Sequence, residues 1–302
     1  MHGPKDSPHS TDSPRLADLA SLIRLPAALS VPGDILAGAV AGGGTPRPRI
    51  AATMASSVAL YWAGMALNDY ADATIDAVER PERPIPSGRV ARRTALATAC
   101  GLTAAGLGLA ALAGGRQALG VALPLTGLVW AYDLRLKSTP AGAAAMAGAR
   151  ALNVLAGAEP GRRGAAVPAA LVVGAHTYTV TALSRHEVSG APRAVPAATL
   201  AGSTATALAA AALPGLRRGG RAARVGAAVG ALGYLASYGT AQARAAREPS
   251  AANVRQAVGT GIMSLMPLQA ALTAGGGGAG LAGVLAVAHP LARRLARKVS
   301  PT

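Results

Sequence analysis

Long apolar stretches of 18 to 25 residues alternate with short charged patches along most of the chain. Stretches of this length suit membrane-spanning helices, because about 20 helical residues cross the hydrocarbon core of a bilayer. We do not expect β-strands to cross the membrane, because a strand of a transmembrane barrel needs only about 10 residues of alternating polarity and these apolar stretches are longer. The pattern predicts membrane helices at 17–43, 50–71, 92–113, 116–133, 139–158, 165–185, 194–214 and 222–243.

The last apolar region, 253–292, fits either one span with a partial second one or two spans that turn at Gly275–Gly278. With the N-terminus in the cytoplasm, 15 Lys and Arg residues fall on the cytoplasmic side and 9 on the opposite side. This bias agrees with the positive-inside rule and favours an even number of spans. We therefore predict an all-α, polytopic membrane helical bundle of about nine transmembrane helices, with ten as the open alternative. The longer polar connections, 72–91 and 184–193, both fall on the cytoplasmic side.

The amino-acid composition supports a membrane protein and limits the classes of binding partner that we expect. Only 14% of the residues are charged and 51% are hydrophobic, whereas soluble domains carry about 25% charged residues. The net charge of +16 comes from arginines at the ends of apolar segments, where they contact anionic membrane lipids. Aromatic residues make up only 3%, so base stacking and nucleic-acid binding are not expected. We predict an integral protein of a prokaryotic inner (cytoplasmic) membrane.

Three regions are expected from the distribution of polar residues. The Pro- and Ser-rich residues 1–15 predict a disordered N-terminal tail. Residues 16–293 predict the transmembrane domain, and residues 294–302 a basic C-terminal tail.

An acidic stretch at the end of the second predicted helix carries the candidate chemistry. Asp69, Asp72 and Asp76 are spaced so that a helix would place them on one face, and Asn68 joins that face. Carboxylates packed together repel one another unless a cation lies between them. Oxygen ligands suit Mg²⁺, which prefers one or two carboxylates together with phosphate oxygens of a substrate. Arg80, Arg83 and Arg89 follow at once, and guanidinium groups bind phosphates. The stretch therefore predicts a Mg²⁺–diphosphate site at a membrane face.

The acidic stretch, followed by Arg83-Pro84-Ile85-Pro86-Ser87-Gly88 and placed between the second and third predicted helices, resembles the UbiA superfamily of intramembrane prenyltransferases. Arg24 and Pro26 resemble an early element of that family. Tyr132 to Lys137 resembles its Tyr-x-x-x-Leu-Lys segment, in which the family places a phosphate-binding lysine. The chain has only three lysines against 26 arginines, so Lys137 is informative by itself. Its alternative role is a membrane anchor.

The second aspartate-rich motif of that family is reduced in this chain. The corresponding segment, 177–190, contains only one acidic residue, Glu187, beside Arg185 and His186. Arg185 is expected to bind the diphosphate and partly replace a second metal ion. The segment resembles the divergent EboC-like branch of the superfamily.

The resemblance implies transfer of a prenyl group from an allylic diphosphate to an aromatic or polar-lipid acceptor, with Mg²⁺ as cofactor. Aromatic rings can stabilise the allylic cation that develops during such a transfer. Each aromatic residue near the motifs also suits an anchor at the membrane interface. These residues are Tyr61, Trp62, Tyr70, Trp130, Tyr132 and Tyr178. The implied roles are catalytic for Asp72, Lys137 and Arg83; diphosphate-binding for Arg80, Arg83, Lys137 and Arg185; metal-binding for Asn68, Asp69, Asp72, Asp76 and Glu187; and substrate-cavity for Arg24, Tyr132, Asn153 and Tyr178.

Two alternatives remain open. The reduced second motif also suits a non-catalytic or transport-like homologue that binds a prenyl diphosphate without turnover. Asn153 with Arg150 lies inside the fifth predicted helix, and polar groups at that depth either line a cavity or bond between helices. An ion-coupled permease that uses Asp72 and Asp76 would leave the Arg83–Gly88 string unexplained.

Overall fold

The computed structural model describes residues 16–24, 28, 30–43, 49–216 and 219–287. The predicted tails and Pro26 lie outside these residues. The regular structure of the described residues is helical throughout. The α-helices with both ends described are α1 (Leu16–Leu22), α2 (Val31–Ala41), α3 (Arg49–Glu79), α4 (Arg92–Ala131), α5 (Gly142–Gly157), α6 (Arg163–Ser184), α7 (Ala194–Leu216), α8 (Arg221–Tyr234), α9 (Thr240–Arg247) and α10 (Ala251–Gly275). A further helical stretch begins at residue 279 and continues to 287, the last described residue.

Three short helical segments join or extend these helices. The π-helical segment η2 (Tyr132–Leu136) extends α4, and a second one, η4 (Leu235–Gly239), joins α8 to α9. A 3₁₀ turn, η3 (Pro160–Arg162), leads into α6.

The helices are long enough, and the outer surface of the bundle is apolar enough, for an integral membrane protein. Five described segments are long and apolar enough to cross a bilayer: Arg49–Glu79, Arg92–Leu136, Pro160–Ser184, Ala194–Leu216 and Ala251–Gly275. Large apolar side chains such as Leu112, Leu171 and Leu208 are exposed on the outside of the helices, where lipid rather than water suits them. The all-helical membrane fold is confirmed, whereas the choice between nine and ten spans stays a prediction.

Most predicted helices form close to their expected ends. The predicted break between 92–113 and 116–133 is present within α4, because Gly114 and Gly115 leave helical geometry and Gly115 has φ +56°. The predicted turn at 275–278 is present where α10 ends. Two expectations were wrong. The span predicted at 17–43 is divided into α1 and α2, and α3 continues to Glu79 instead of ending at residue 71.

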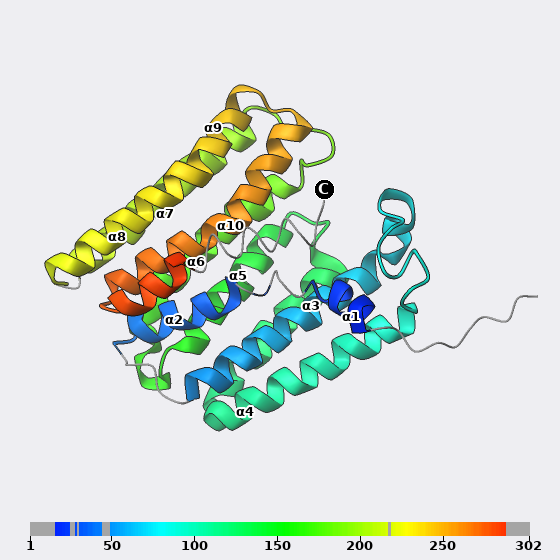
Figure 1. The fold of residues 1–302 in the computed structure, drawn as a ribbon, viewed down its shortest axis with the longest axis horizontal. Helices are drawn as coiled ribbons and strands as arrows, with labels where there is room; N and C mark the ends of the chain where they lie inside the picture. Colours follow the sequence, from blue (N-terminus) through cyan, green and yellow to red (C-terminus); the bar gives the residue numbers. More distant parts are fainter. Residues whose placement is uncertain (1–15, 25–27, 29, 44–48, 217–218, 288–302) are drawn as a thin grey trace, which may run out of the picture.

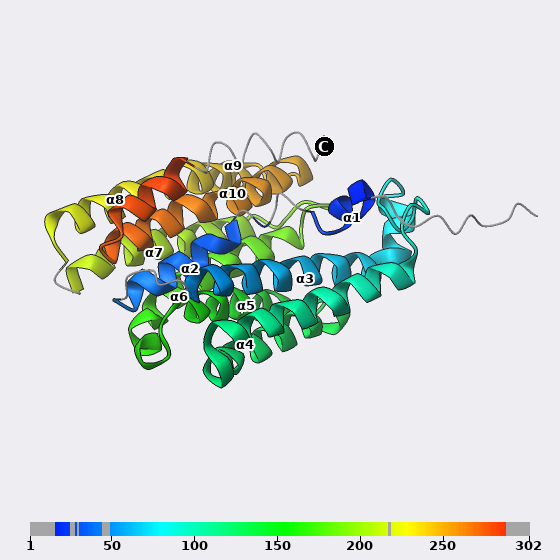
Figure 2. The same ribbon diagram turned by 60° about the horizontal axis from the view of Figure 1, so that its bottom comes forward.

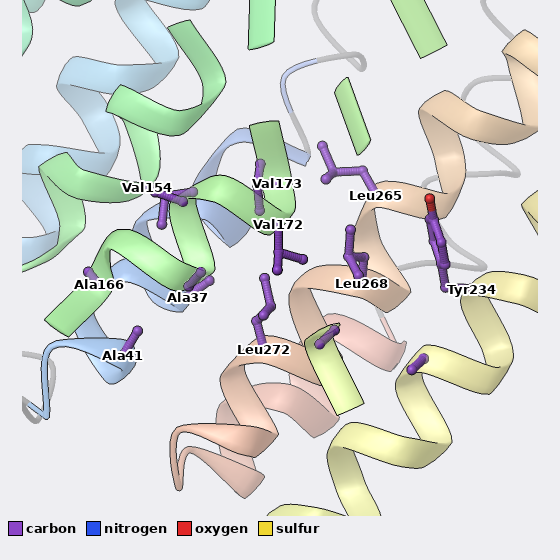
Figure 3. Close-up of a cluster of buried hydrophobic side chains, with 14 of the residues drawn as sticks. Ala37, Ala41, Val154, Ala166, Val172, Val173, Tyr234, Leu265, Leu268 and Leu272 are labelled. Atoms are coloured by element: carbon purple, nitrogen blue, oxygen red, sulfur yellow. The ribbon is translucent and has the colours of Figure 1, made fainter. Parts of the chain in front are cut away.

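The helices are arranged in three groups across the bundle. Figure 1 shows α3 and α4 along one side and α7, α8 and α9 along the other, with α2, α5, α6 and α10 between them. The second view agrees, and it shows α3 and α4 side by side along their length (Figure 2). A large apolar cluster joins the two sides through residues of α2, α5, α6 and α10 such as Ala37, Val154, Val173 and Leu268 (Figure 3).

Close approach of α2 and α5 depends on glycine. A Cβ atom added at Gly38 of α2 would lie 1.8 Å from the carbonyl oxygen of Val154, and one added at Gly157 of α5 would lie 2.1 Å from that of Ile35. Real Cβ atoms do not approach backbone atoms so closely, so the two helices pack backbone to backbone. Small residues commonly allow such contacts between membrane helices.

We expect Gly38→Ala to lower the melting temperature in detergent, because the added methyl group must separate α2 from α5. Overpacking of this kind typically costs about 1–3 kcal/mol. Gly127→Ala on α4 is the matched control, since a Cβ there meets nothing within 4 Å and alanine favours the helix. Equal melting temperatures of the two variants would contradict the proposed backbone contact.

Candidate active site

The acidic stretch lies on the last turns of α3, and its carboxylates fall into two groups with different partners. Asp69 and Asp76 are buried, with 3% and 4% exposure. The side chain of Asp72 retains 20% exposure. The helix continues through all three residues because basic side chains from three other parts of the chain compensate their charges.

Arg83 and Arg24 hold the first group. Arg83 Nη1 lies 2.5 Å from Asp76 Oδ2 and 3.5 Å from Asp69 Oδ1, so one guanidinium bridges two carboxylates. Arg24 Nη2 lies 2.9 Å from the same oxygen of Asp69. The backbone of Arg24 is left-handed, with φ +48°, a conformation that costs a non-glycine residue about 1 kcal/mol or more. The ion pair with Asp69 helps to hold this strained turn.

Lys137 and Asp133 join the second group. Lys137 Nζ lies 2.5 Å from Asp72 Oδ1, and Asn68 Nδ2 donates to Asp133 Oδ1 at 3.2 Å. Asp133 is buried and lies on the π-helical segment η2, which brings it and Lys137 to the face of α3. Sequence reasoning missed Asp133 as a site residue. A carboxylate inside an apolar span, directly after Tyr132, was the signal that could have identified it.

The predicted metal-ligand set does not form one cluster. Within the described part of the chain, no three His, Cys, Asp or Glu side chains gather closely enough to hold a metal ion. Arg24 and Arg83 engage Asp69 and Asp76, while Asp72 turns toward Lys137. The metal-binding roles of Asn68, Asp69, Asp72, Asp76 and Glu187 stay predictions.

The connection between α6 and α7 lies at the same end of the bundle. Arg185 Nη1 donates to the carbonyl oxygen of Thr139, two residues after Lys137, at 3.2 Å. Arg255 Nη1 donates to the carbonyl oxygen of Glu187 at 3.5 Å. Burial raises the pKa of the Glu187 carboxyl, and the charges of Arg80 and Arg255 oppose that rise. Glu187 thus has arginines from two other segments as its electrostatic partners.

The predicted cavity residues have different surroundings. Arg24 lies at the acidic stretch, and Tyr132 directly precedes Asp133 on η2. Tyr178 is 48% exposed on α6 and makes no hydrogen bond or ring contact with a described residue. Asn153 is buried, and both ends of its amide are hydrogen-bonded: Oδ1 accepts from Ser57 Oγ, and Nδ2 donates to Asp34 Oδ2 at 2.8 Å.

Asn153 belongs to a second polar group deeper in the bundle, which sequence reasoning found only in part. Asp34 on α2 is fully buried and is held by Arg150 Nε at 3.0 Å, by Asn153 and by Gln269 Nε2 at 2.6 Å. We call Asp34, Ser57, Arg150, Asn153 and Gln269 the interior polar cluster. An acidic residue in the middle of the first apolar segment was its signal in the sequence.

Comparison with known proteins places the chain in a family. The model of the UbiA prenyltransferase family matches residues 31–299. The digeranylgeranylglyceryl phosphate synthase of Methanopyrus kandleri is 42% identical over 111 residues, which cover 36% of this chain and 38% of that protein. The enzyme of the same name from Ignicoccus hospitalis is 39% identical over 128 residues, covering 40% of each chain. These alignments thus span about two fifths of each relative.

Solved structures match over a larger part of the chain. One from work on digeranylgeranylglyceryl phosphate synthase in membranes has a TM-score of 0.65 at 16% identity and covers 86% of this chain and 98% of that one. The ligand-free structure of a UbiA homologue from Aeropyrum pernix K1 has a TM-score of 0.64 at 17% identity, covering 81% and 96%. At these identities the likeness concerns the fold. With the family model matching residues 31–299, the chain is a member of the UbiA prenyltransferase family.

Proposed function

We propose that this protein is a Mg²⁺-dependent intramembrane prenyltransferase that moves a prenyl group from an allylic diphosphate to a polar-lipid acceptor. The observation that carries the proposal is the contact of Lys137 with Asp72 beside Asn68 and Asp133, because it joins a phosphate-binding cation to a set of hard oxygen donors. Family membership supports the reaction class. The name of the relatives supports an acceptor that carries a glyceryl phosphate.

The donor set around Asp72 fits a magnesium ion. Asn68 donates through its nitrogen to Asp133, which leaves its amide oxygen for a cation. Asp72 and Asp133 come from separate elements and supply carboxylates, and Mg²⁺ needs only one or two of these when phosphate oxygens complete its shell. Asn68, Asp72 and Asp133 would hold the ion. When bound, it would supply charge stabilisation for the departing diphosphate.

The basic residues perform the rest of the binding. Lys137, Arg24 and Arg83 come from three separate parts of the chain and pair with the acidic stretch, and N–H donors of this kind stabilise charge that develops on a leaving group. The bond between prenyl C1 and the diphosphate oxygen breaks, and its electron pair leaves with the diphosphate. An acceptor oxygen forms the new bond to C1 and gives up its proton to the leaving group or to water.

Aromatic side chains and the bundle interior protect the allylic cation. Tyr70 is engaged by Arg92, whose guanidinium carbon lies 4.6 Å from the ring centre, and Trp130 donates to Thr103 at 3.2 Å. Tyr61 lies on the same helix as the acidic stretch and Tyr132 directly precedes Asp133, so their rings are the candidates to face the cation. Exclusion of water limits hydrolysis.

The active-site end of the bundle is proposed to face the cytoplasm of a prokaryotic cell. The acidic stretch lies at the end of α3 that leads into the connection with Arg83, and Glu187 lies in another connection. Both connections are on the side richer in Lys and Arg, which is the cytoplasmic side by the positive-inside rule. A soluble prenyl diphosphate synthesised in the cytoplasm would then reach the site directly.

Purified protein tests the function. It is incubated with Mg²⁺, a panel of allylic diphosphates and two acceptor classes, prenylglyceryl phosphates and hydroxybenzoates, and diphosphate release is measured. We expect release that depends on the acceptor and stops when EDTA removes the metal. Saturable binding of prenyl diphosphate without release, across the whole panel, would instead support the non-catalytic homologue.

A further inference from the structure

The connection between α3 and α4, residues 80–91, carries Arg83 and is held together by its own hydrogen bonds. The N–H and the hydroxyl of Ser87 both donate to the carbonyl oxygen of Arg83, at 3.0 and 2.6 Å. The N–H of Val90 donates to the carbonyl oxygen of Pro84 at 2.9 Å, and the Val90 side chain is buried. The backbone of Arg83 is therefore fixed by residues that follow it in the same connection.

Arg89 links the two sides of this connection. Its Nη2 donates to the carbonyl oxygen of Glu82 at 2.7 Å, and its Nε donates to the hydroxyl of Ser87 at 3.0 Å. Glu82 directly precedes Arg83, and Ser87 bonds to it, so the guanidinium contacts the chain on both sides of Arg83. The third nitrogen, Nη1, pairs with Asp18 Oδ1 at 3.0 Å. Each nitrogen of Arg89 thus has a partner that lies outside the acidic stretch.

Asp18 joins the connection to α1. Asp18 and Leu22 are four residues apart and therefore share one face of that helix. Leu22 is fully buried in an apolar cluster that contains Leu67 of α3 and Val90 of the connection. Both views place α1 beside the end of α3 that leads into the connection (Figure 1 and Figure 2). An ion pair and an apolar contact together thus fix the connection to α1 and α3.

We propose that Asp18 is a positioning residue for the diphosphate-binding site, and that it acts on Arg83 through Arg89. The proposal rests on the prenyltransferase function. It gives Arg89 a different role from the phosphate contact that its place in the sequence suggests. Donors stabilise a leaving group best when they are already held in position. The contacts of Arg89 hold the backbone that carries the Arg83 guanidinium.

The two possible roles of Arg89 predict opposite effects of Asp18→Ala. If Arg89 contacts the diphosphate itself, removal of Asp18 frees an N–H donor and uncovers a positive charge. Binding of the diphosphate would then become tighter or stay the same. If Arg89 positions Arg83, the same substitution loosens the connection and weakens binding. The direction of the change in Kd therefore separates the two roles.

The binding test uses purified protein, Mg²⁺ and a non-hydrolysable prenyl thiodiphosphate. We expect Asp18→Ala and Ser87→Ala each to raise the Kd about tenfold, the lower end of what loss of an orienting partner costs at metal sites. Asp18→Glu should restore most of the affinity. Melting temperatures should stay close to that of the unmodified protein, because the Arg89 side chain is 45% exposed and exposed ion pairs contribute little to stability.

Glu82→Gln is the matched control for Asp18→Ala. It removes one negative charge from the same connection, where the Glu82 side chain is exposed, and it leaves the carbonyl oxygen that Arg89 contacts. We expect an unchanged Kd for this variant. In all variants the KM for the acceptor should stay unchanged, because the proposed effect concerns the diphosphate alone.

Hydrogen exchange tests the structural part of the proposal without a ligand. The amides of Ser87 and Val90 are hydrogen-bonded within the connection, so they should exchange slowly in the unmodified protein. We expect Asp18→Ala to accelerate exchange in residues 80–91 and to leave α10 unchanged. Equal exchange in both proteins would overturn the proposal, because Asp18 would then not hold the connection.

The binding data can overturn the proposal in a second way. An unchanged or tighter Kd for Asp18→Ala, together with a weaker one for Arg89→Lys, would show that Arg89 contacts the diphosphate directly. Failure of the prenyltransferase function would look different, because the unmodified protein would then neither bind the thiodiphosphate nor release diphosphate. Hydrogen exchange would still decide whether Asp18 fixes the connection.

Discussion

Asp72→Asn should lower prenyl transfer by two to three orders of magnitude while the protein stays folded. The substitution removes the charge of a proposed metal ligand and the partner that holds Lys137 Nζ at 2.5 Å. Loss of one group that stabilises transition-state charge typically costs about 10²–10³ in kcat. Both side chains of this ion pair are about one-fifth exposed, and a partly solvated pair contributes little to stability. Diphosphate release under saturating Mg²⁺ measures the effect.

Glu79→Gln is the matched control for Asp72→Asn. Glu79 is exposed at the end of the same helix, so the control removes one negative charge from the same region without touching the site. We expect near-normal turnover and an unchanged melting temperature. Activity of Asp72→Asn within threefold of wild type would contradict the assigned role of Asp72, whatever happens to the control.

Arg83→Gln should damage stability as well as activity. Its guanidinium bridges Asp69 and Asp76, which are almost completely buried, and its own side chain is only 16% exposed. Removal of one partner from a buried ion pair typically costs about 3–5 kcal/mol, because the remaining charge stays uncompensated. We expect a clearly lower melting temperature in detergent and no measurable transfer. Arg93→Gln, on the exposed face at the start of α4, should change neither property.

The double variant Arg83→Gln with Asp76→Asn separates the two effects. Without the charge on Asp76, most of the lost stability should return, whereas transfer should remain absent because the diphosphate has lost a guanidinium donor. Recovery of activity together with stability would show that Arg83 acts only by compensating Asp76.

The helices could be predicted from the sequence because lipid imposes a simple rule on them. Apolar runs of about 20 residues form spans, and Gly114 and Gly115 break one such run where expected. The end of α3 could not be predicted in the same way. Asp72 and Asp76 make the last turns polar, and the helix continues there because Arg83 and Lys137 arrive from other segments. Local composition does not contain those contacts.

The site residues that belong to a recognisable sequence motif could be predicted. Those that only the fold brings together could not. The acidic stretch and Lys137 were expected to lie together, and they do. Asp133 was missed because nothing in the spacing of residues 68 and 133 reveals that they are neighbours. The separation of Asp69 and Asp76 from Asp72 depends on which arginine reaches which carboxylate. The role of Glu187 as a metal ligand stays a prediction.

The interior polar cluster also bears on how the protein is made. Asp34 enters the membrane early in synthesis, but its donors Arg150 and Asn153 follow more than a hundred residues later and Gln269 only with α10. Chains are synthesised from the N-terminus at about 5–20 residues per second, so the carboxylate waits on the order of tens of seconds for its last partner, 235 residues later. A chain truncated before α10 would retain a polar defect in its centre that membrane quality control can detect. Asp34 thus makes assembly of the whole bundle depend on the arrival of its last helices.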